Sequence, residues 1–358
     1  MASLKLRDRD SILTREGLLF RVLGYSHPTD KYICDAEYAS AKIFTSKDPR
    51  APRTGGNQNF YKFYNDEGMK LVLKKYPHYT VFLEMLGQKV VAVNPDGAET
   101  RKPEKRLPEL IETEPKDTLV DAMQRVLNMM LQQSGLSMTD FGVFGSMLHG
   151  FHHPDFSDID LVVYGRKQNA KMREVLSELY ADDASSFSNE FSNPDVMHSK
   201  RWLYQNLTVK EFLWHQRRKQ IYGLFNDSKS GRVTKVEFEP VKAWTEITSE
   251  YDSEARIVQK GWVKLKARIV DDTDTPFIPS IYTIKPLEVL SGPKEALKSA
   301  RIVSYMEEFR LQAQKDEVVY VEGNLEEVAS PAIGFHQITL TYCPRYYEQV
   351  LKVVGLTS

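Results

Sequence analysis

The pattern of apolar and polar residues in the first hundred positions predicts mainly β-strands. The segments GLLFRVLGY (17–25) and YTVFLEMLG (79–87) are rich in β-branched, aromatic and large apolar residues. Between them, SKDPRAPRTGGNQN (46–59) has the composition of a loop, and NPDG at 94–97 is typical of a hairpin turn. We therefore expect a β-rich region at the start of the chain.

A charged segment and a long helix follow this region. The segment DGAETRKPEKRLPELIETEPKD (96–117) combines prolines with dense charge and has no apolar period, which predicts a linker and a domain boundary near residue 115. The next stretch predicts a helix with Asp117 as its N-cap and Gly135 just beyond its end. Its apolar residues recur at helical spacing: Leu119, Met123, Val126, Leu127 and Met130.

Strands and helices alternate in the middle of the chain. A short strand, FGVF, leads into Gly145-Ser146 and the short helical turn SMLHG. The strand DIDLVVYG follows, and then a helix over roughly 168–181. We predict a further helix over TVKEFLWHQRRKQIYGLF (208–225), a loop over NDSKSGR, and a strand over the alternating segment VTKVEFEPV (233–241).

After about residue 250 the pattern again predicts strands, in WVKLKARIV, DEVVYVEG and HQITLTYC. In the first of these the apolar residues Val263, Leu265, Ala267 and Ile269 share one face, and Lys264, Lys266 and Arg268 share the other. This basic face suits either a solvated strand or contact with a nucleic-acid backbone. VDDTDTP (270–276) has the composition of a solvated turn.

Composition narrows the class of protein. The chain has 358 residues, which favours two or three domains, and its formal net charge of −1 gives no global attraction to nucleic acid or membranes. The two cysteines, Cys34 and Cys343, provide neither a disulfide framework nor metal-ligand spacing. No apolar run approaches roughly 18 residues, and MASLKLRDRD has no signal-peptide core. We expect a cytoplasmic protein.

Two aspartates suggest metal chemistry. Asp158 and Asp160 lie two residues apart at the start of a strand, so their carboxylates point to one face while Ile159 points into the core. Mg²⁺ prefers oxygen ligands and is usually held by a few carboxylates together with substrate phosphates. Upstream, Gly145 lets the backbone approach a phosphate closely, and the Ser146 hydroxyl can donate to it.

Gly-Ser, eleven intervening residues and then Asp-Ile-Asp between apolar residues resembles the signature of the DNA polymerase β-like nucleotidyltransferase superfamily. The resemblance covers roughly residues 116–245. More loosely, the whole chain, with REGLLFRVLGYSHP near its start, is similar to uncharacterised archaeal nucleotidyltransferases. The resemblance implies an α+β protein with a mixed-sheet catalytic core, a divalent cation (Mg²⁺ or Mn²⁺) and an NTP substrate.

The resemblance also implies a third carboxylate on a later strand. Glu237 lies between Val236 and Phe238 and is our first choice as metal ligand and general base, with Glu239 as the fallback. In the alternative interpretation both glutamates are solvated on an edge strand.

Cations are also required to bind a triphosphate. On the helix predicted over 208–225, Gln216 and Arg217 interrupt the apolar face, and Arg218 and Lys219 flank them. We predict that these three cations bind phosphate, with a structural ion pair to Glu237 or Asp160 as the alternative.

The three histidines between the Gly-Ser turn and the aspartates, His149, His152 and His153, have spacings that do not match a structural zinc site. We interpret them as part of a loop near the nucleotide, with a histidine–zinc hydrolase as the rival.

Together these features predict three segments: a β-rich domain (1–115), a nucleotidyltransferase core (116–249) and a second β-rich domain (250–358). The predicted reaction moves NMP from an NTP to a hydroxyl acceptor, which is RNA, a protein or a small molecule. An RNA acceptor would contact Lys264, Lys266 and Arg268. The alternative is a catalytically inactive nucleic-acid-binding module on the same fold. The sequence leaves the oligomeric state open.

Overall fold

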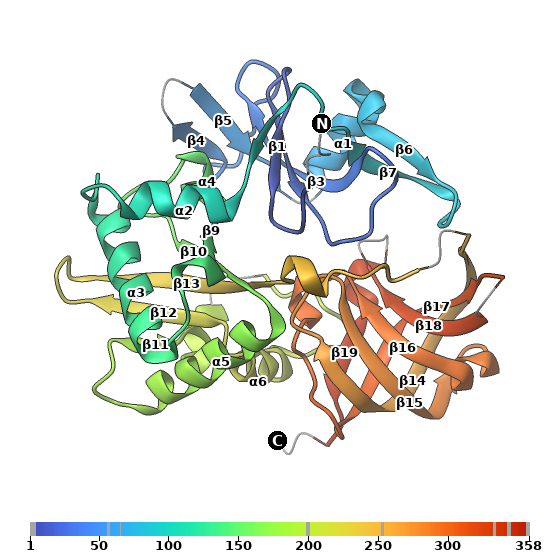
Figure 1. Ribbon diagram of the computed structural model, residues 1–358. Helices are drawn as coiled ribbons and strands as arrows, with labels where there is room; N and C mark the ends of the chain where they lie inside the picture. Colours follow the sequence, from blue (N-terminus) through green and yellow to red (C-terminus); the bar gives the residue numbers. More distant parts are fainter. Residues whose placement is uncertain are drawn as a thin grey trace. The chain divides into compact units, whose positions relative to one another are not determined.

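The computed structural model describes residues 5–55, 58–64, 66–197, 201–251, 254–331, 334–341 and 345–355 (Figure 1). Cys343, and with it the end of the strand predicted over HQITLTYC, lies outside these residues. The chain divides into two compact units. The first comprises Met1–Leu83, Gly87–Val175 and Phe225–Glu250, and the second Glu84–Leu86, Leu176–Leu224 and Tyr251–Ser358. The three-segment division stays a prediction.

The β-rich start of the chain is confirmed. Its strands are β1 (Ser11–Leu13), β2 (Leu18–Val22), β3 (Tyr32–Ser40), β4 (Pro52–Gly55), β5 (Gln58–Lys62), β6 (Thr80–Leu83), β7 (Gln88–Val93) and β8 (Glu99–Arg101). They pair in the order β4-β5-β3-β2-β1-β8, and β7 pairs with both β3 and β6. Buried Ile12, Leu18, Phe20 and Val22 supply its core. Helix α1 (Glu67–Lys75) was not predicted.

Three expectations for this region need correction. The predicted loop over 46–59 contains β4 and the first two residues of its partner β5, and these polar, largely solvent-facing residues have no apolar pattern. NPDG does form a turn, with Ala98 N donating to Pro95 O (3.0 Å), but it is no hairpin: β7 pairs with β3 and β6, whereas β8 pairs with β1. The predicted linker over 96–117 contains β8 and helix α2 (Pro103–Ile111).

Helix α2 forms in a highly charged segment because a few residues give it an apolar side. Leu107 and Leu110 are three residues apart and both are buried. Pro103 occupies the first turn, where a missing backbone N–H costs nothing. The remaining positions are densely charged, so the sequence of this segment shows no clear helical period of apolar residues.

Strands β12, β13, β10 and β9 are neighbours, in that order, in the central sheet (Figure 1). β10 and β13 are parallel, whereas β9 and β10 are antiparallel, so the sheet is mixed as expected. Its elements, in chain order, are α3 (Thr118–Ser134), β9 (Phe141–Val143), α4 (Gly145–His149), β10 (Ile159–Tyr164), α5 (Arg166–Ala181), β12 (Tyr222–Asp227) and β13 (Arg232–Val241).

Helix α3 begins and ends where the sequence predicted. The Asp117 carboxylate accepts hydrogen bonds from the backbone N–H groups of Leu119 and Val120, and Gly135 ends the helix in the left-handed conformation (φ 68°). In contrast, the helix predicted over 208–225 is wrong in its second half. Helix α6 (Val209–Arg218) ends early, and residues 222–227 form β12 instead.

The second unit contains the short strand β11 (Phe187–Asn189), α6 and a sheet of long strands, orange and red in Figure 1. These are β14 (Arg256–Asp274), β15 (Ser280–Ser291), β16 (Ser299–Ser304), β17 (Val318–Ala329), β18 (Gly334–Leu340) and β19 (Val350–Val353). They pair in the order β14-β15-β16-β18-β17, and β17 also pairs with β14, which closes a five-stranded barrel. The segment 270–276, predicted as a turn, belongs mostly to the end of β14. No helix in the described residues is long and apolar enough to cross a membrane.

Candidate active site

The turn between β9 and α4 lies directly against the acidic strand. Phe144 N donates a hydrogen bond to Asp160 O (3.0 Å). Gly145 has φ +60°, and a Cβ atom at this position would lie 2.0 Å from Asp160 Oδ2. A larger residue would therefore collide with the carboxylate as well as strain the backbone. Glycine at 145 is what allows the Gly-Ser turn and Asp160 to come together.

Three carboxylates gather at this end of the sheet. Asp160 and Glu237 occupy matching positions on the parallel strands β10 and β13, and Asp158 immediately precedes β10. Burial raises the pKa of Asp160 well above its usual range, and the negative charges of Glu237, Asp158 and Glu239 raise it further. Lys235 opposes this rise in pKa. Burial and the neighbouring negative charges therefore make the ionised form of Asp160 costly in the folded protein.

Glu237 and Glu239 lie on the same strand in different surroundings. Glu237 Oε1 is 2.6 Å from Lys235 Nζ, and its side chain keeps 21% of its surface exposed. Glu239 Oε2 is 2.7 Å from a guanidinium nitrogen of Arg9, and both of these side chains are almost completely buried. The Arg9 guanidinium also lies over the ring of Phe144, 5.2 Å from its centre. Glu237 thus faces the carboxylate group, whereas Glu239 is neutralised by a buried arginine.

The donor set suits a hard divalent cation in its chemistry. Carboxylate oxygens from two neighbouring strands are the ligands that Mg²⁺ and Mn²⁺ take, and a bound cation would favour the ionised form of Asp160, which burial and the nearby negative charges disfavour. Across the part of the chain that the structure describes, no three His, Cys, Asp or Glu side chains are arranged around a common metal position. The carboxylates therefore suit a divalent cation by their chemistry and by their place on adjacent strands. In this structure Glu237 is paired with Lys235.

Ser146 lies in the first turn of α4, half-buried, and its carbonyl accepts from Phe151 N (2.8 Å). The far end of this short helix is held by two arginines. Arg106 Nε donates to Met147 O (3.4 Å), and an Arg101 nitrogen donates to His149 O (3.5 Å). These contacts fix the Gly-Ser turn from its C-terminal side.

The three cations predicted to bind phosphate lie in the second unit, and each has a partner there. An Arg217 guanidinium nitrogen donates to Phe191 O (3.2 Å). Arg218 pairs with Glu317 (2.6 Å), and its guanidinium lies 4.1 Å from the centre of the Trp214 ring. Lys219 is fully buried and donates to Glu308 O (2.7 Å). Their role in phosphate binding stays a prediction.

The three histidines have separate partners. His149 is buried against Tyr38 and Phe151, and burial, followed by the charges of Arg101 and Arg106, lowers its pKa to about 3. His152 Nε2 is 2.9 Å from Asp117 Oδ2. His153 Nδ1 accepts from Asp155 N (3.1 Å). In the described residues these side chains share no metal position.

Sequence reasoning missed Lys235 and Arg9. Lys235 has a local signal, because the alternation in VTKVEFEPV places it on the same face as Glu237. Arg9 has none, since it meets Glu239 across 230 residues of sequence and its backbone adopts a left-handed conformation (φ 73°).

The chain is similar to known proteins in two comparisons. Residues 123–212 match the family model described as a nucleotidyltransferase domain, and this segment includes the Gly-Ser turn and both aspartates. Over 329 residues the chain is 27% identical to the uncharacterized protein MJ1086 of Methanocaldococcus jannaschii. The match covers 91% of this chain and 92% of the relative. No solved structure matches significantly.

Proposed function

We propose that the protein is a metal-dependent nucleotidyltransferase of the polymerase β-like type, which moves NMP from an NTP to a hydroxyl acceptor and releases pyrophosphate. The match of residues 123–212 to a nucleotidyltransferase domain supports this proposal. The observation that carries the proposal is the placement of Asp160 opposite Glu237, beside the Gly145 turn. It places carboxylates, whose oxygens suit a divalent cation, beside the Gly-Ser turn.

The residues divide into two roles. Asp158, Asp160 and Glu237 would hold Mg²⁺ or Mn²⁺, which when bound supplies the positive charge that offsets these carboxylates and the triphosphate. Backbone N–H groups of the Gly145–Ser146 turn and the Ser146 hydroxyl would hold the phosphates. Lys235 adds a positive charge next to Glu237.

In the reaction, an acceptor hydroxyl oxygen attacks the α-phosphorus. A new oxygen–phosphorus bond forms, the bond from the α-phosphorus to the bridging oxygen breaks, and pyrophosphate leaves with the electron pair. The acceptor proton passes to the Glu237 carboxylate, which acts as general base and later releases the proton to water. Arg217, Arg218 and Lys219 would neutralise the leaving group only by giving up their present partners.

The acceptor that we propose is a hydroxyl of a protein or a small molecule. An RNA acceptor would depend on the basic face of β14. There Lys264 pairs with Glu322 (3.2 Å) and Lys266 with Glu288 (3.0 Å), while Arg268 donates to Asp316 O (2.9 Å). This strand therefore offers a polyanion less positive charge than its sequence indicates.

The test is a transfer assay on the full chain. Each α-labelled NTP is supplied with Mg²⁺ or Mn²⁺ and with RNA, protein or small-molecule acceptors, and labelled product and pyrophosphate are measured. Asp158→Asn and Asp160→Asn should each lower transfer by at least about 10³-fold, since transition-state charge stabilisation is lost. Asp155→Asn, an exposed aspartate three residues from Asp158, serves as the control and should retain transfer.

Full transfer by either of the first two variants would refute the site. Salt-dependent RNA binding without turnover in the wild type would support the inactive nucleic-acid-binding module instead.

A further inference from the structure

We propose that Arg232 is a positioning residue that fixes Asp158 relative to the strand carrying Glu237. This inference rests on the proposed function, because it assigns Arg232 to the geometry of the same carboxylate site. It concerns residues 150–158, which connect α4 to β10 and which we call the Asp158 loop.

The Arg232 guanidinium holds the Asp158 loop at two carbonyl groups. One terminal nitrogen donates to Pro154 O, and the other donates to Ser157 O at 2.8 Å. The second of these carbonyls belongs to the peptide that joins Ser157 to Asp158. A planar guanidinium that donates in two directions fixes both the position and the tilt of that peptide.

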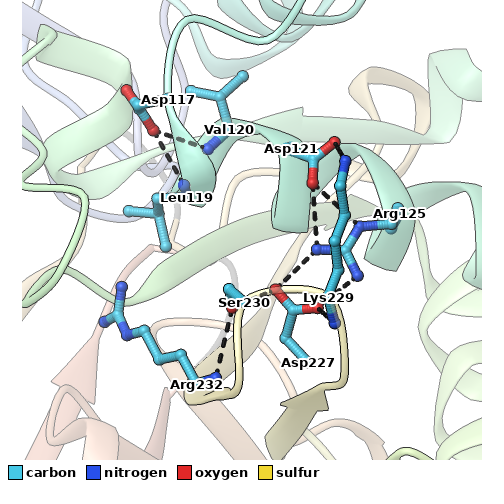
Figure 2. Close-up of polar contacts among 9 residues, drawn as sticks. All are labelled: Asp117, Leu119, Val120, Asp121, Arg125, Asp227, Lys229, Ser230 and Arg232. Carbon is cyan, nitrogen blue, oxygen red and sulfur yellow. Dashed lines mark hydrogen bonds and ion pairs between the residues drawn. The ribbon is translucent and has the colours of Figure 1, made fainter.

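Arg232 is also the first residue of β13. Farther along this strand Glu237 occupies the position opposite Asp160. One side chain therefore ties the backbone before Asp158 to the strand of the third carboxylate. Figure 2 shows the Arg232 side chain directed away from the neighbouring Arg125–Asp227 pair, so it is not part of that ion pair.

Two further contacts hold the other end of the Asp158 loop. Phe151 is buried in a cluster with Leu19, Tyr38 and Phe60. His152 Nε2 is 2.9 Å from Asp117 Oδ2, the carboxylate that also caps α3. Within the loop, Phe156 N and Ser157 N both donate to His153 O (3.3 and 3.1 Å). The loop is thus anchored near its start, and Arg232 supplies the anchor next to Asp158.

The direction of the change in metal affinity distinguishes a positioning role of Arg232 from a purely electrostatic role. Removing a cation near a group of carboxylates should by itself strengthen the binding of a divalent cation. Loss of the two carbonyl contacts should instead let Asp158 move and weaken metal binding, because outer contacts of this kind orient the ligands. Weaker binding in a neutral variant therefore cannot come from the lost charge.

The experiment measures metal binding by the full chain without turnover. Mn²⁺ binding is followed by electron paramagnetic resonance, and hydrogen exchange of the amides of Phe156 and Ser157 is followed by mass spectrometry. Arg232→Gln should raise the Kd for Mn²⁺ about tenfold and speed exchange in the Asp158 loop. Arg232→Lys keeps the charge but loses the two-way geometry, and it should also bind Mn²⁺ more weakly than the wild type.

Arg125→Gln is the matched control. It breaks an ion pair in the same corner of the molecule but does not touch the Asp158 loop, so it should lower the Tm and leave the Kd for Mn²⁺ unchanged. Wild-type affinity in Arg232→Gln would overturn the inference while leaving the proposed function intact. Absence of Mn²⁺ binding in the wild type would overturn the proposed function, and the inference with it.

Discussion

Two groups of carboxylates on the central sheet differ in what surrounds them. On β10, Asp160 faces other carboxylates, and burial and their charges raise its pKa well above the usual range. At the end of β12, Asp227 meets Arg125 through two hydrogen bonds of 2.6 and 2.7 Å. Figure 2 shows this corner, where Lys229 also reaches Asp121. The hydrogen bonds from Arg125 hold the pKa of Asp227 well below the usual range.

The comparison distinguishes a carboxylate that stabilises the fold from one that serves a site. Asp227 has a built-in cation, so its charge contributes to holding β12 against α3. Asp160 has like charges for neighbours, which make its ionised form costly, and Lys235 offsets this cost only in part. The surroundings of Asp227 thus favour its ionised form, whereas those of Asp160 disfavour it.

Glu237 and Glu239 allow a catalytic role and a structural role to be compared on one strand. Glu237→Gln should lower transfer by about 100-fold or more, because a general base contributes roughly 10² to 10⁴. Its effect on the Tm should be small. Glu239→Gln removes the 2.7 Å ion pair of the buried Arg9, which keeps Asp8 at 3.7 Å, and should cost on the order of 3 kcal/mol of unfolding free energy. Transfer assays and thermal unfolding on both variants measure the two effects.

Both variants are assayed well below their Tm, so that the folded enzymes are compared. The two residues are matched in chemistry and lie on one strand, two positions apart. If Glu239→Gln abolished transfer while Glu237→Gln retained it, the roles would be reversed and Glu239 would be the third carboxylate.

The Arg125–Asp227 pair should show the opposite behaviour. Arg125→Gln should lower the free energy of unfolding at pH 7 by about 1–3 kcal/mol, because Asp227 is buried while Arg125 is 32% exposed. Transfer by the folded variant should not change. Denaturant titrations of wild type and variant at several pH values measure the difference.

The pH dependence of that difference follows from the pKa shift. The folded pKa of Asp227 lies below its unfolded value of roughly 4, so the pair stabilises the protein fully above that pH. As the pH falls toward the folded pKa, Asp227 becomes protonated and the contribution is lost. The stability of wild type and Arg125→Gln should therefore converge in acid, and a difference that grew in acid would contradict this account.

Local patterns were enough to predict much of the domain. Helix α3 has its apolar residues at helical spacing and both ends marked, by Asp117 and Gly135. The Gly-Ser turn and the Asp-Ile-Asp strand are equally local, and the parallel pairing then brings Asp160 to Glu237. In these elements the chemistry of adjacent residues decides the structure.

The sequence-based predictions failed where contacts between residues far apart in the chain determine the structure. Helix α2 forms in a segment with the charge of a linker because Leu107 and Leu110 are buried by other parts of the chain. Arg9 reaches Glu239, and Arg232 reaches Ser157, across separations that no local pattern records. Likewise, Lys219 is buried on a carbonyl 89 residues away. Inward-facing cations in a sequence do not reveal whether a ligand or the protein itself will pair with them.

The most direct test of the central claim is a calorimetric titration of each NTP in the presence of Mg²⁺, with wild type and the Asp158→Asn, Asp160→Asn double variant compared. The account predicts that the wild type binds at least one NTP only when Mg²⁺ is present. The folded double variant should lose that binding. Equal binding by both proteins, or no binding by either, would contradict the claim that these carboxylates form a metal-dependent nucleotide site.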